Sequence, residues 1–272
     1  MVVYLKTGIQ INAKLIFGMS KKDINMRLSP SKFDTYRECP RKYRFRYIDR
    51  LGPLYRKSRP YLTMGTNVHA ALKDFFDLPL EKRKDHALLK FLEDRWGQNR
   101  MGFRSEYEEE KYKHRARLQL KLFAGTFDLS VLPLMTEKYV RSHLSGMLLE
   151  GVVDRVDGES AGAHVLDYKT GAKQDDISPL SLYMYALILY GRKDLPSIYR
   201  VSFVFLESGS MKTWEFGPNE TMQALEEILT GAFEISSDSS YAPRPDWWCR
   251  GCDFLEICPE GQEVVTFRRE AK

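Results

Sequence analysis

The stretch LDYKTG, residues 166–171, carries the residue types of a metal-dependent hydrolytic site. Side chains at i and i+2 of a strand share one face, so Asp167 and Lys169 are expected to project together. The strand before it, within GVVDRVD, offers Asp154, which a hairpin would bring beside Asp167. Paired carboxylates favour Mg²⁺ or Mn²⁺, and a lysine beside them can orient a water and stabilise charge on a phosphate. A D-x-K tripeptide alone is more often a surface ion pair, so the prediction depends on further ligands.

Four cysteines form a second candidate metal site. Cys249, Cys252 and Cys258 follow the spacing C-x2-C-x5-C, and Cys39 is the remaining thiol of the sequence. In a cytoplasmic chain, where thiols stay reduced, this spacing favours metal ligation over disulfides. A tetrahedral site needs four ligands, and Cys39 is available as the fourth. Three separate buried cysteines are the alternative interpretation.

The sequence around Cys39 is basic. Residues 31–60 contain ten Lys or Arg against three Asp or Glu, whereas the whole chain has a formal net charge of +5. A local field of this kind suits a polyanion such as nucleic acid. The side chains predicted to bind DNA phosphates are Arg41, Lys42, Arg44 and Arg46. A solvated helix face is the alternative, with Tyr43 and Tyr47 packed in the core.

The hydrophobic pattern around the acidic motifs predicts an α/β unit with strands at residues 136–142, 147–157, 164–169, 200–207 and 211–216. An apolar helix is expected at residues 178–191. A strand–helix–strand crossover returns the chain parallel to the first strand, so the sheet should be mixed.

Short helices are expected before this unit. Ser31 and Asp34 resemble a capping box, and Pro40 should interrupt the helix that they begin. A second helix is expected over residues 41–49.

Gly65 is expected to open a longer helix that carries His69 on an apolar face, where a histidine by itself is more often a core residue. The highly charged residues 81–129 predict two amphipathic helices joined around residues 97–102. Residues 1–25 show no sustained period and are expected to be an extension or a start-site artefact.

Composition favours an ordinary globular protein, since 43% of the 272 residues are hydrophobic and 29% are charged. No apolar run approaches the roughly 18–20 residues that a membrane span needs. Polar residues interrupt the N-terminal apolar stretch, which argues against a signal peptide. A cytoplasmic protein with no membrane partner is expected.

Together these motifs resemble the RecB-like branch of the PD-(D/E)XK nuclease superfamily. GVVDRVD and LDYKTG resemble its two metal-site strands, and GTNVHAALKDFF resembles its upstream histidine helix. The resemblance implies a restriction-endonuclease-like α/β core, with a mixed central sheet flanked by helices. It implies His69, Asp154, Asp167 and the backbone carbonyl of Tyr168 as metal ligands, with Lys169 positioning the attacking water.

Other positions can be compared with the branch. Glu137 falls where its first strand often carries an acid, although a surface glutamate is the alternative. The helix after the lysine usually bears a glutamine and, four residues later, a tyrosine. Tyr185 fits the tyrosine and a catalytic role, but Ser181 replaces the glutamine. Val153 replaces the superfamily's proline before the first aspartate.

The cysteines also match branch members that hold an iron–sulfur cluster, in which one cysteine precedes the histidine helix and C-x2-C-x5-C with a following proline ends the core. Cys39, Cys249, Cys252, Cys258 and Pro259 reproduce this pattern. The resemblance implies a 4Fe–4S cluster that fastens both chain ends to the core, with Zn²⁺ as the competitor. The implied organisation is an extension at 1–25 and a nuclease domain at 26–272, with a helical insertion at about 81–129 and a cysteine segment at 245–262.

The resemblance implies a DNA exonuclease that acts on single strands or free ends, in repair or recombination or in CRISPR adaptation, with a protein partner from one of these systems. Two other classes stay open. One is a nucleic-acid-binding module that has lost catalysis and keeps a structural iron–sulfur or zinc site. The other is a zinc-stabilised protein-interaction domain.

Overall fold

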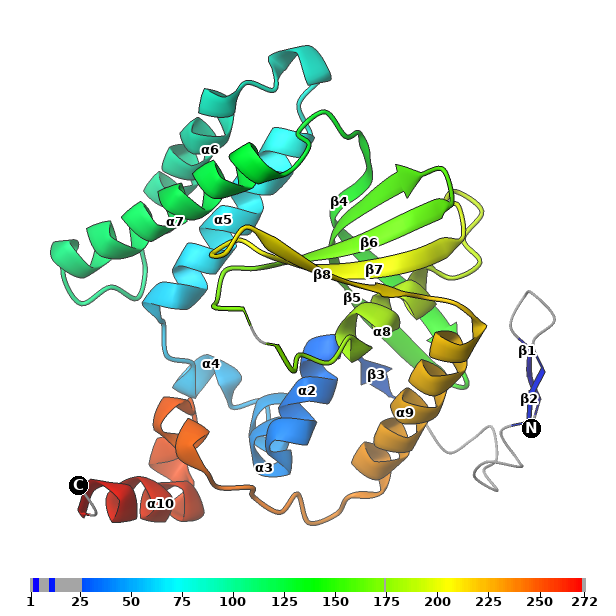
Figure 1. Cartoon of the computed structure of the whole chain (residues 1–272). Helices are drawn as coiled ribbons and strands as arrows, with labels where there is room; N and C mark the ends of the chain where they lie inside the picture. Colours follow the sequence, from blue (N-terminus) through cyan, green and yellow to red (C-terminus); the bar gives the residue numbers. More distant parts are fainter. Residues whose placement is uncertain (1, 5–9, 13–25, 174, 271–272) are drawn as a thin grey trace.

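The computed structural model describes residues 2–4, 10–12, 26–173 and 175–270. A mixed sheet lies at the centre of this structure (Figure 1). Within these residues its six strands are β3 (Arg27–Leu28), β4 (Pro133–Leu144), β5 (Met147–Glu159), β6 (Gly162–Lys169), β7 (Ile198–Phe205) and β8 (Ser210–Glu215). The order of neighbours is β3-β5-β6-β7-β8, and β4 pairs with β5. The five predicted strands are confirmed to within a few residues, and β3 is added to them.

The sheet is mixed because it contains the predicted strand–helix–strand crossover as well as hairpins. Helix α8 (Leu180–Leu189) connects β6 to β7, and these two strands are parallel. The hairpins β4–β5, β5–β6 and β7–β8 are antiparallel. The predicted crossover is therefore confirmed, and it places the carboxyl ends of β6 and β7 at one edge of the molecule.

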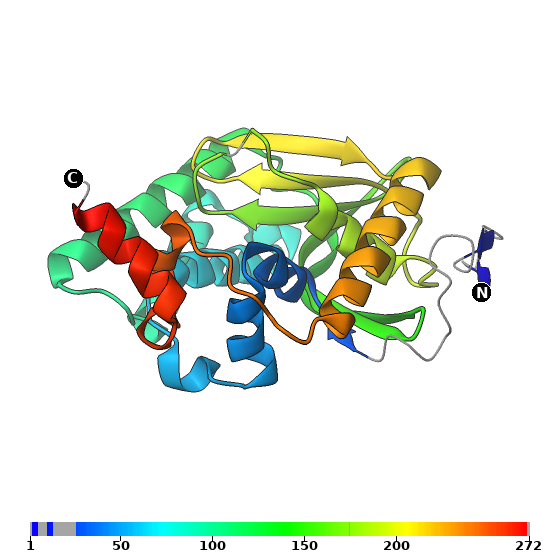
Figure 2. The ribbon, with the colours of Figure 1, turned by 90° about the horizontal axis from the view of Figure 1, so that it is seen from below.

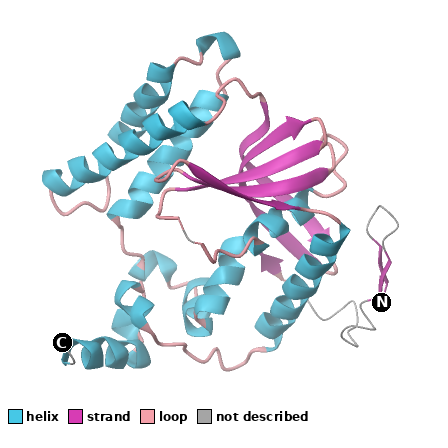
Figure 3. Cartoon of the chain, viewed as in Figure 1, coloured by secondary structure: helices cyan, strands magenta, loops and turns pink. Residues whose placement is uncertain are grey.

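Helices cover both faces of the sheet (Figure 3). The buried hydrophobic side chains form two cores. The first core lies against α2 (Pro30–Glu38), α8 and α9 (Pro218–Ser237). The second core lies against α5 (Pro60–Phe76), α6 (Asp85–Gln98) and α7 (Glu106–Thr126). Helix α8 is apolar almost all round because it packs between the sheet and other helices of the first core. The expected α/β class and the two helices of the insertion are thus confirmed.

The N-terminal helices differ from the prediction in their details. Ser29, not Ser31, is the N-cap of α2, since its Oγ accepts the Lys32 N–H at 3.2 Å. Pro30 takes the first helical position, where its missing N–H has no cost. Cys39 is extended between α2 and α3 (Pro40–Tyr43), and a π-helical turn, η1 (Arg44–Ile48), and α4 (Gly52–Tyr55) follow.

Helix α5 begins at Pro60, so Gly65 lies inside it and the predicted start at Gly65 is wrong. A Cβ at this glycine would lie 3.3 Å from Thr170 Oγ1, which is tighter than most contacts of real Cβ atoms. The absence of a side chain at Gly65 therefore allows the loop after β6 to approach α5 closely. The helix itself begins at Pro60, a residue that is favoured in the first turn. The turn between α6 and α7 packs against the same end of α5, where Thr63 Oγ1 donates to the Met101 carbonyl at 2.6 Å.

Two helices at the C-terminal end were not predicted. Helix α9 follows Gly217 and Pro218, and Glu220 Oε2 accepts the Gly217 N–H at 3.0 Å. The cysteine segment contains η3 (Trp247–Gly251) and η4 (Leu255–Ile257) and leads into α10 (Pro259–Glu270). Figure 2 shows α10, in red, on the opposite side of the molecule from α9. A further short turn, η2 (Leu80–Lys82), follows α5.

Residues 1–25 contain a pair of short antiparallel strands, β1 (Val2–Tyr4) and β2 (Gln10–Asn12), which the sequence did not predict. The rest of the predicted extension lies outside the described residues. No helix in the described ranges is long and apolar enough to span a membrane.

We predict that Gly231→Ala lowers the free energy of unfolding by roughly 1–3 kcal/mol. A Cβ at Gly231 in α9 would lie 2.3 Å from Phe33 Cε2, so α2 or the phenylalanine must shift. Urea unfolding measures the effect. Gly125→Ala in α7 is the matched control, because a Cβ there has nothing within 4 Å, and it should stabilise by at most about 1 kcal/mol. Equal stabilities of the two variants would contradict the close packing of α2 on α9.

Candidate active site

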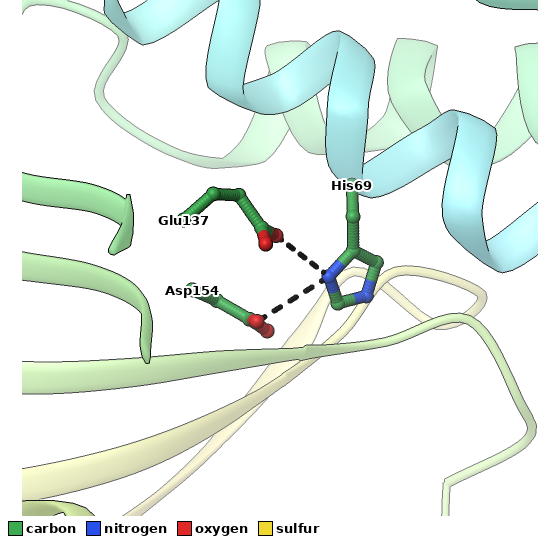
Figure 4. Close-up of side chains that lie close together, drawn as sticks. All are labelled: His69, Glu137 and Asp154. Carbon is green, nitrogen blue, oxygen red and sulfur yellow. Dashed lines mark hydrogen bonds and ion pairs between the residues drawn. The ribbon is translucent and has the colours of Figure 1, made fainter. Parts of the chain in front are cut away.

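An imidazole and two carboxylates converge beside the sheet (Figure 4). His69 Nδ1 lies 3.0 Å from Glu137 Oε1 and 3.4 Å from Asp154 Oδ1. One ligand atom from each of the three residues lies within 4.8 Å of the other two. The Asp154 side chain is only 10% exposed. Because two carboxylates close together and partly withdrawn from water repel each other, this arrangement favours a cation between them.

The histidine is held at both ring nitrogens. On the side away from the carboxylates, His69 Nε2 lies 3.1 Å from the carbonyl oxygen of Tyr168. Burial opposes the imidazolium, but hydrogen bonds to Asp154 and Glu137 outweigh it and raise the pKa of His69 to about 10. In the metal-free protein at neutral pH, both nitrogens therefore carry protons and donate.

The Tyr168 peptide is available because β5 and β6 separate here. Their ladder ends at the pair Arg155–Leu166. Beyond it, the Tyr168 N–H donates to Asp154 Oδ2 at 2.7 Å and the Tyr168 carbonyl faces His69. Peptide groups that a longer ladder would have used thus fix one carboxylate and the imidazole.

Side-chain alternation along β5 shifts by one residue at this point. Val153 and Val156 both pack in the first core. Of the two residues between them, Asp154 reaches the histidine of α5, and the Arg155 guanidinium lies 4.0 Å from the ring centroid of Phe76, also in α5. The shift directs the carboxylate toward α5 from a strand whose neighbouring valines point the other way.

Glu137 has an unusual backbone on the paired strand β4. Its φ is +40°, in the left-handed region that costs a residue with a Cβ roughly 1–2 kcal/mol. The flanking pairs Thr136–Arg155 and Lys138–Val153 place it opposite Asp154. Strain of this kind persists where the surroundings hold it, and functional sites are common locations for it.

Asp167 and Lys169 project together, as expected, and form an ion pair in which Lys169 Nζ lies 2.6 Å from Asp167 Oδ2. Among the described residues, Asp167 is outside the group of ligand atoms within 4.8 Å of one another. Burial raises the pKa of Asp167 to about 6; Lys169 opposes this shift and the charge of Asp154 adds to it. The Asp167 carboxylate therefore stands beside the three-residue group, turned toward its lysine.

Tyr185 approaches the carboxylates from α8, and a glycine on β5 makes room for its ring. A Cβ at Gly151 would lie 2.7 Å from Tyr185 Cε1. Burial raises the pKa of Tyr185, and the charges of Asp167, Asp154 and Glu137 raise it further. The phenol thus stays protonated near neutral pH and is a hydrogen-bond donor beside the acidic group.

The protein family of this chain follows from its match to a family model. The family model described as the PD-(D/E)XK nuclease superfamily matches residues 27–259, which is most of the chain. The chain belongs to the PD-(D/E)XK nuclease superfamily. No curated protein sequence is significantly similar to it.

Solved structures that are similar to this PD-(D/E)XK chain include the following two. The first is a "Putative exonuclease" from Eubacterium rectale, at 12% identity and a TM-score of 0.45, with 94% of each chain covered. The second is the protein SSO0001, at 12% identity and a TM-score of 0.38, with 89% of this chain and 88% of that one covered.

The four cysteines of this PD-(D/E)XK protein line one pocket. Cys39 comes from the α2–α3 junction, and Cys249, Cys252 and Cys258 come from the segment before α10. Gly261 forms part of the wall, and a Cβ there would lie 3.4 Å from Cys258 Sγ and 3.7 Å from Cys249 Sγ. Among the described residues, no three of these sulfurs lie mutually within 4.8 Å.

Each of the four sulfurs has a backbone N–H donor. The Arg244 N–H lies 3.4 Å from Cys39 Sγ, and the Asp246 N–H lies 3.4 Å from Cys249 Sγ. The N–H groups of Phe254 and Gly261 donate to Cys252 and Cys258. Burial nevertheless raises the pKa of Cys252 and Cys258. N–H donors of this kind stabilise thiolates, which are the form that binds metal.

The basic side chains predicted to bind DNA all have carboxylate partners within the protein. The pairs are Arg41–Glu260, Lys42–Glu38, Arg44–Asp49 and Arg46–Asp253. Their DNA-binding role stays a prediction, and part of the local positive charge is used to pack the cysteine segment against α3 and η1. Tyr43 is buried, as the alternative interpretation expected.

The buried pair Arg155–Asp157 beside the site was not predicted from the sequence. The guanidinium donates twice to the carboxylate, both times at 2.7 Å, and the residues are 4% and 6% exposed. The signal was present in GVVDRVD, since charges in an apolar strand are rarely buried unless they are paired. The pair fixes β5 on the side where Asp154 emerges.

We predict that binding of Mn²⁺ at about pH 8 releases about one proton from His69. The metal-free imidazole has a pKa of about 10, so it is charged at this pH and must lose its proton to become a ligand. Affinity should therefore rise with pH toward 10. Calorimetry in buffers of different ionisation enthalpy measures the release. His69→Gln should abolish it, and His86→Gln, on the exposed surface of α6, should not. Proton release unchanged in His69→Gln would exclude this histidine as a ligand.

Proposed function

We propose that this PD-(D/E)XK protein is a Mg²⁺- or Mn²⁺-dependent deoxyribonuclease, acting as an exonuclease on single-stranded DNA ends. The observation that carries the proposal is the group His69, Glu137 and Asp154 beside the Asp167–Lys169 ion pair. Membership of a nuclease superfamily supports a nucleic acid as substrate.

The residues present fit a hard divalent cation. Carboxylate and carbonyl oxygens suit Mg²⁺ and Mn²⁺, and an imidazole is compatible with Mn²⁺. We propose Glu137, Asp154 and His69 as ligands, with Asp167 as a further ligand once its carboxylate turns away from Lys169. The Tyr168 carbonyl, also predicted as a ligand, contacts His69 Nε2 at 3.1 Å, so it would have to leave this nitrogen to join the carboxylates. In such a site a divalent cation supplies Lewis acidity toward the phosphodiester and lowers the pKa of a water.

The protein's own groups then have separate roles. Lys169, whose side chain is 35% exposed, can position the attacking water and stabilise negative charge on the phosphate. Asp167 holds the ammonium in place at 2.6 Å. The Tyr185 phenol can donate a hydrogen bond to a phosphate oxygen, whereas Ser181 at the usual glutamine position has a shorter reach.

DNA repair or recombination and CRISPR adaptation both need an enzyme that trims DNA from a free end, and we propose one of these settings. A protein partner would come from the same system, and the expected cytoplasmic location stays part of this proposal.

We predict that the protein degrades end-labelled single-stranded DNA with Mn²⁺, and that Lys169→Ala and Asp154→Asn reduce the rate about 100-fold or more. Removal of either group takes away charge stabilisation in the transition state. Lys173→Ala is the matched control, because this lysine lies in the loop after β6 with its side chain 47% exposed. Gel analysis of the labelled products measures the rate and the direction of digestion.

Wild-type cleavage that persists in Lys169→Ala would contradict the mechanism. Binding of DNA in chelator with no turnover in Mn²⁺ would instead favour the nucleic-acid-binding module that has lost catalysis.

We propose in addition that the four cysteines hold a 4Fe–4S cluster. The pocket that they share and its backbone N–H donors support this assignment. The role is structural: the ligands join the α2–α3 junction to the C-terminal segment.

We predict that Cys39→Ala removes the iron and loosens the packing of α3 against the cysteine segment, because one ligand of four is lost. Anaerobic purification, an absorption spectrum and iron analysis measure the cluster, and limited proteolysis measures the packing. Arg37→Ala, two residues earlier with its side chain 55% exposed, is the control. Full iron content in Cys39→Ala would make Cys39 a lone thiol, and a colourless preparation with stoichiometric zinc would replace the cluster by zinc.

A further inference from the structure

The metal-ligand group opens into a groove that runs along α5. The groove has a volume of about 580 Å³, within the range of roughly 300–1,000 Å³ that is usual for ligand pockets. Its lining follows α5 from Tyr61 and Leu62 past His69 to Lys73, with Glu137 beside the histidine. Thr170, from the loop after β6, forms part of the opposite wall.

Two large apolar side chains are exposed in this groove. Tyr61 is 46% exposed and Leu62 is 44% exposed, and neither belongs to the two cores. Between them and the histidine, α5 presents the small residues Gly65 and Thr66. The small side chains leave space beside the helix there, whereas the Tyr61 side chain projects from it. A flat ligand can therefore lie in this space against the aromatic ring.

The tyrosine is fixed at its hydroxyl end. Arg59 Nη1 donates to Tyr61 Oη at 2.8 Å, and Arg59 Nη2 pairs with Asp253 Oδ1 at 2.8 Å. Asp253, whose side chain is 9% exposed, also accepts Arg46 Nη2 at 2.9 Å. Anchoring the hydroxyl leaves the ring face available and reduces the entropy that stacking would cost.

The spacing along α5 suits a nucleic-acid strand. Tyr61 precedes His69 by two turns of helix, which is about 12 Å at 1.5 Å per residue. Stacked nucleotides repeat about every 3.4 Å, so about three of them span this distance. Aromatic side chains that stack on unpaired bases bind single strands with little sequence preference. Bases inside a duplex are paired and stacked on one another, so they cannot use such a ring.

We infer that Tyr61, supported by Leu62, forms a stacking subsite for an unpaired nucleobase about three nucleotides from the scissile phosphate. The inference rests on the proposed nuclease function, because it takes the metal-ligand group as the place of cleavage. Arg59 is a positioning residue, and through Asp253 it connects the subsite to the cysteine segment. The ligand class is a single-stranded polynucleotide, and the subsite would give the proposed nuclease a preference for unpaired ends.

The test is binding of short oligothymidylates in chelator, so that cleavage does not enter the measurement. Fluorescence anisotropy gives the dissociation constant, and a single 2-aminopurine moved along the strand reports base stacking by its quenching. Tyr61→Ala should weaken single-strand binding about tenfold and relieve the quenching at one position. Tyr61→Phe keeps the ring but loses the hydrogen bond from Arg59, so its affinity should lie between those of the wild type and Tyr61→Ala. Binding to a blunt duplex should not change.

Tyr107→Ala is the matched control, because this tyrosine of α7 is 82% exposed and lies outside the groove. Thermal melting should show all three variants folded, since both tyrosines are on the surface. Equal affinities for Tyr61→Ala and Tyr107→Ala would overturn the subsite, even in an active nuclease. If instead Mn²⁺-dependent cleavage is absent and Tyr61→Ala still weakens binding, the nuclease proposal fails and the subsite stands as a single-strand binding site.

Discussion

Repulsion between two carboxylates is the constraint around which this fold is arranged. Glu137 and Asp154 both lie within 3.4 Å of one imidazole nitrogen, on neighbouring strands that are partly withdrawn from water. Without a cation, the imidazolium of His69 compensates them, and this explains the raised pKa of the histidine. The imidazolium thus occupies the position between the carboxylates where we propose that a metal ion binds.

The sheet creates the space for this group by ending one ladder early. Where β5 leaves β6, the Tyr168 peptide turns its hydrogen-bonding groups to Asp154 and His69. The helices on the two faces of the sheet each supply one side chain to the site: α5 supplies His69, and α8 supplies Tyr185. Glycines allow both approaches, Gly65 for the loop after β6 and Gly151 for the tyrosine ring. Packing on each face of the sheet thus determines how closely the side chains from that face approach the carboxylates of the site.

The termini are joined by a second polar network. Asp253 accepts hydrogen bonds from Arg46, Arg59 and the Lys57 N–H, and in the sequence it lies between Cys252 and Phe254. Much of the positive charge of residues 31–60 is thereby matched by acids of the same chain. A cationic sequence segment need not be a cationic surface, because its charges can be used to hold distant parts of the chain together.

The sequence by itself determined five strands of the main sheet, the crossover helix and the two charged helices, and it singled out His69, Glu137 and Asp154, which the structure brings together. Each of these depends on local periodicity or on a short motif, and local signals survive folding when the apolar face that they define is buried. It did not determine the shift of alternation at Asp154, the positive φ of Glu137 or the buried pair Arg155–Asp157. These depend on which strand lies opposite and on what α5 presents to it. The shared partner of Arg46 and Arg59, Asp253, was likewise decided by tertiary structure, because it lies 207 and 194 residues away in sequence and only folding brings it near them.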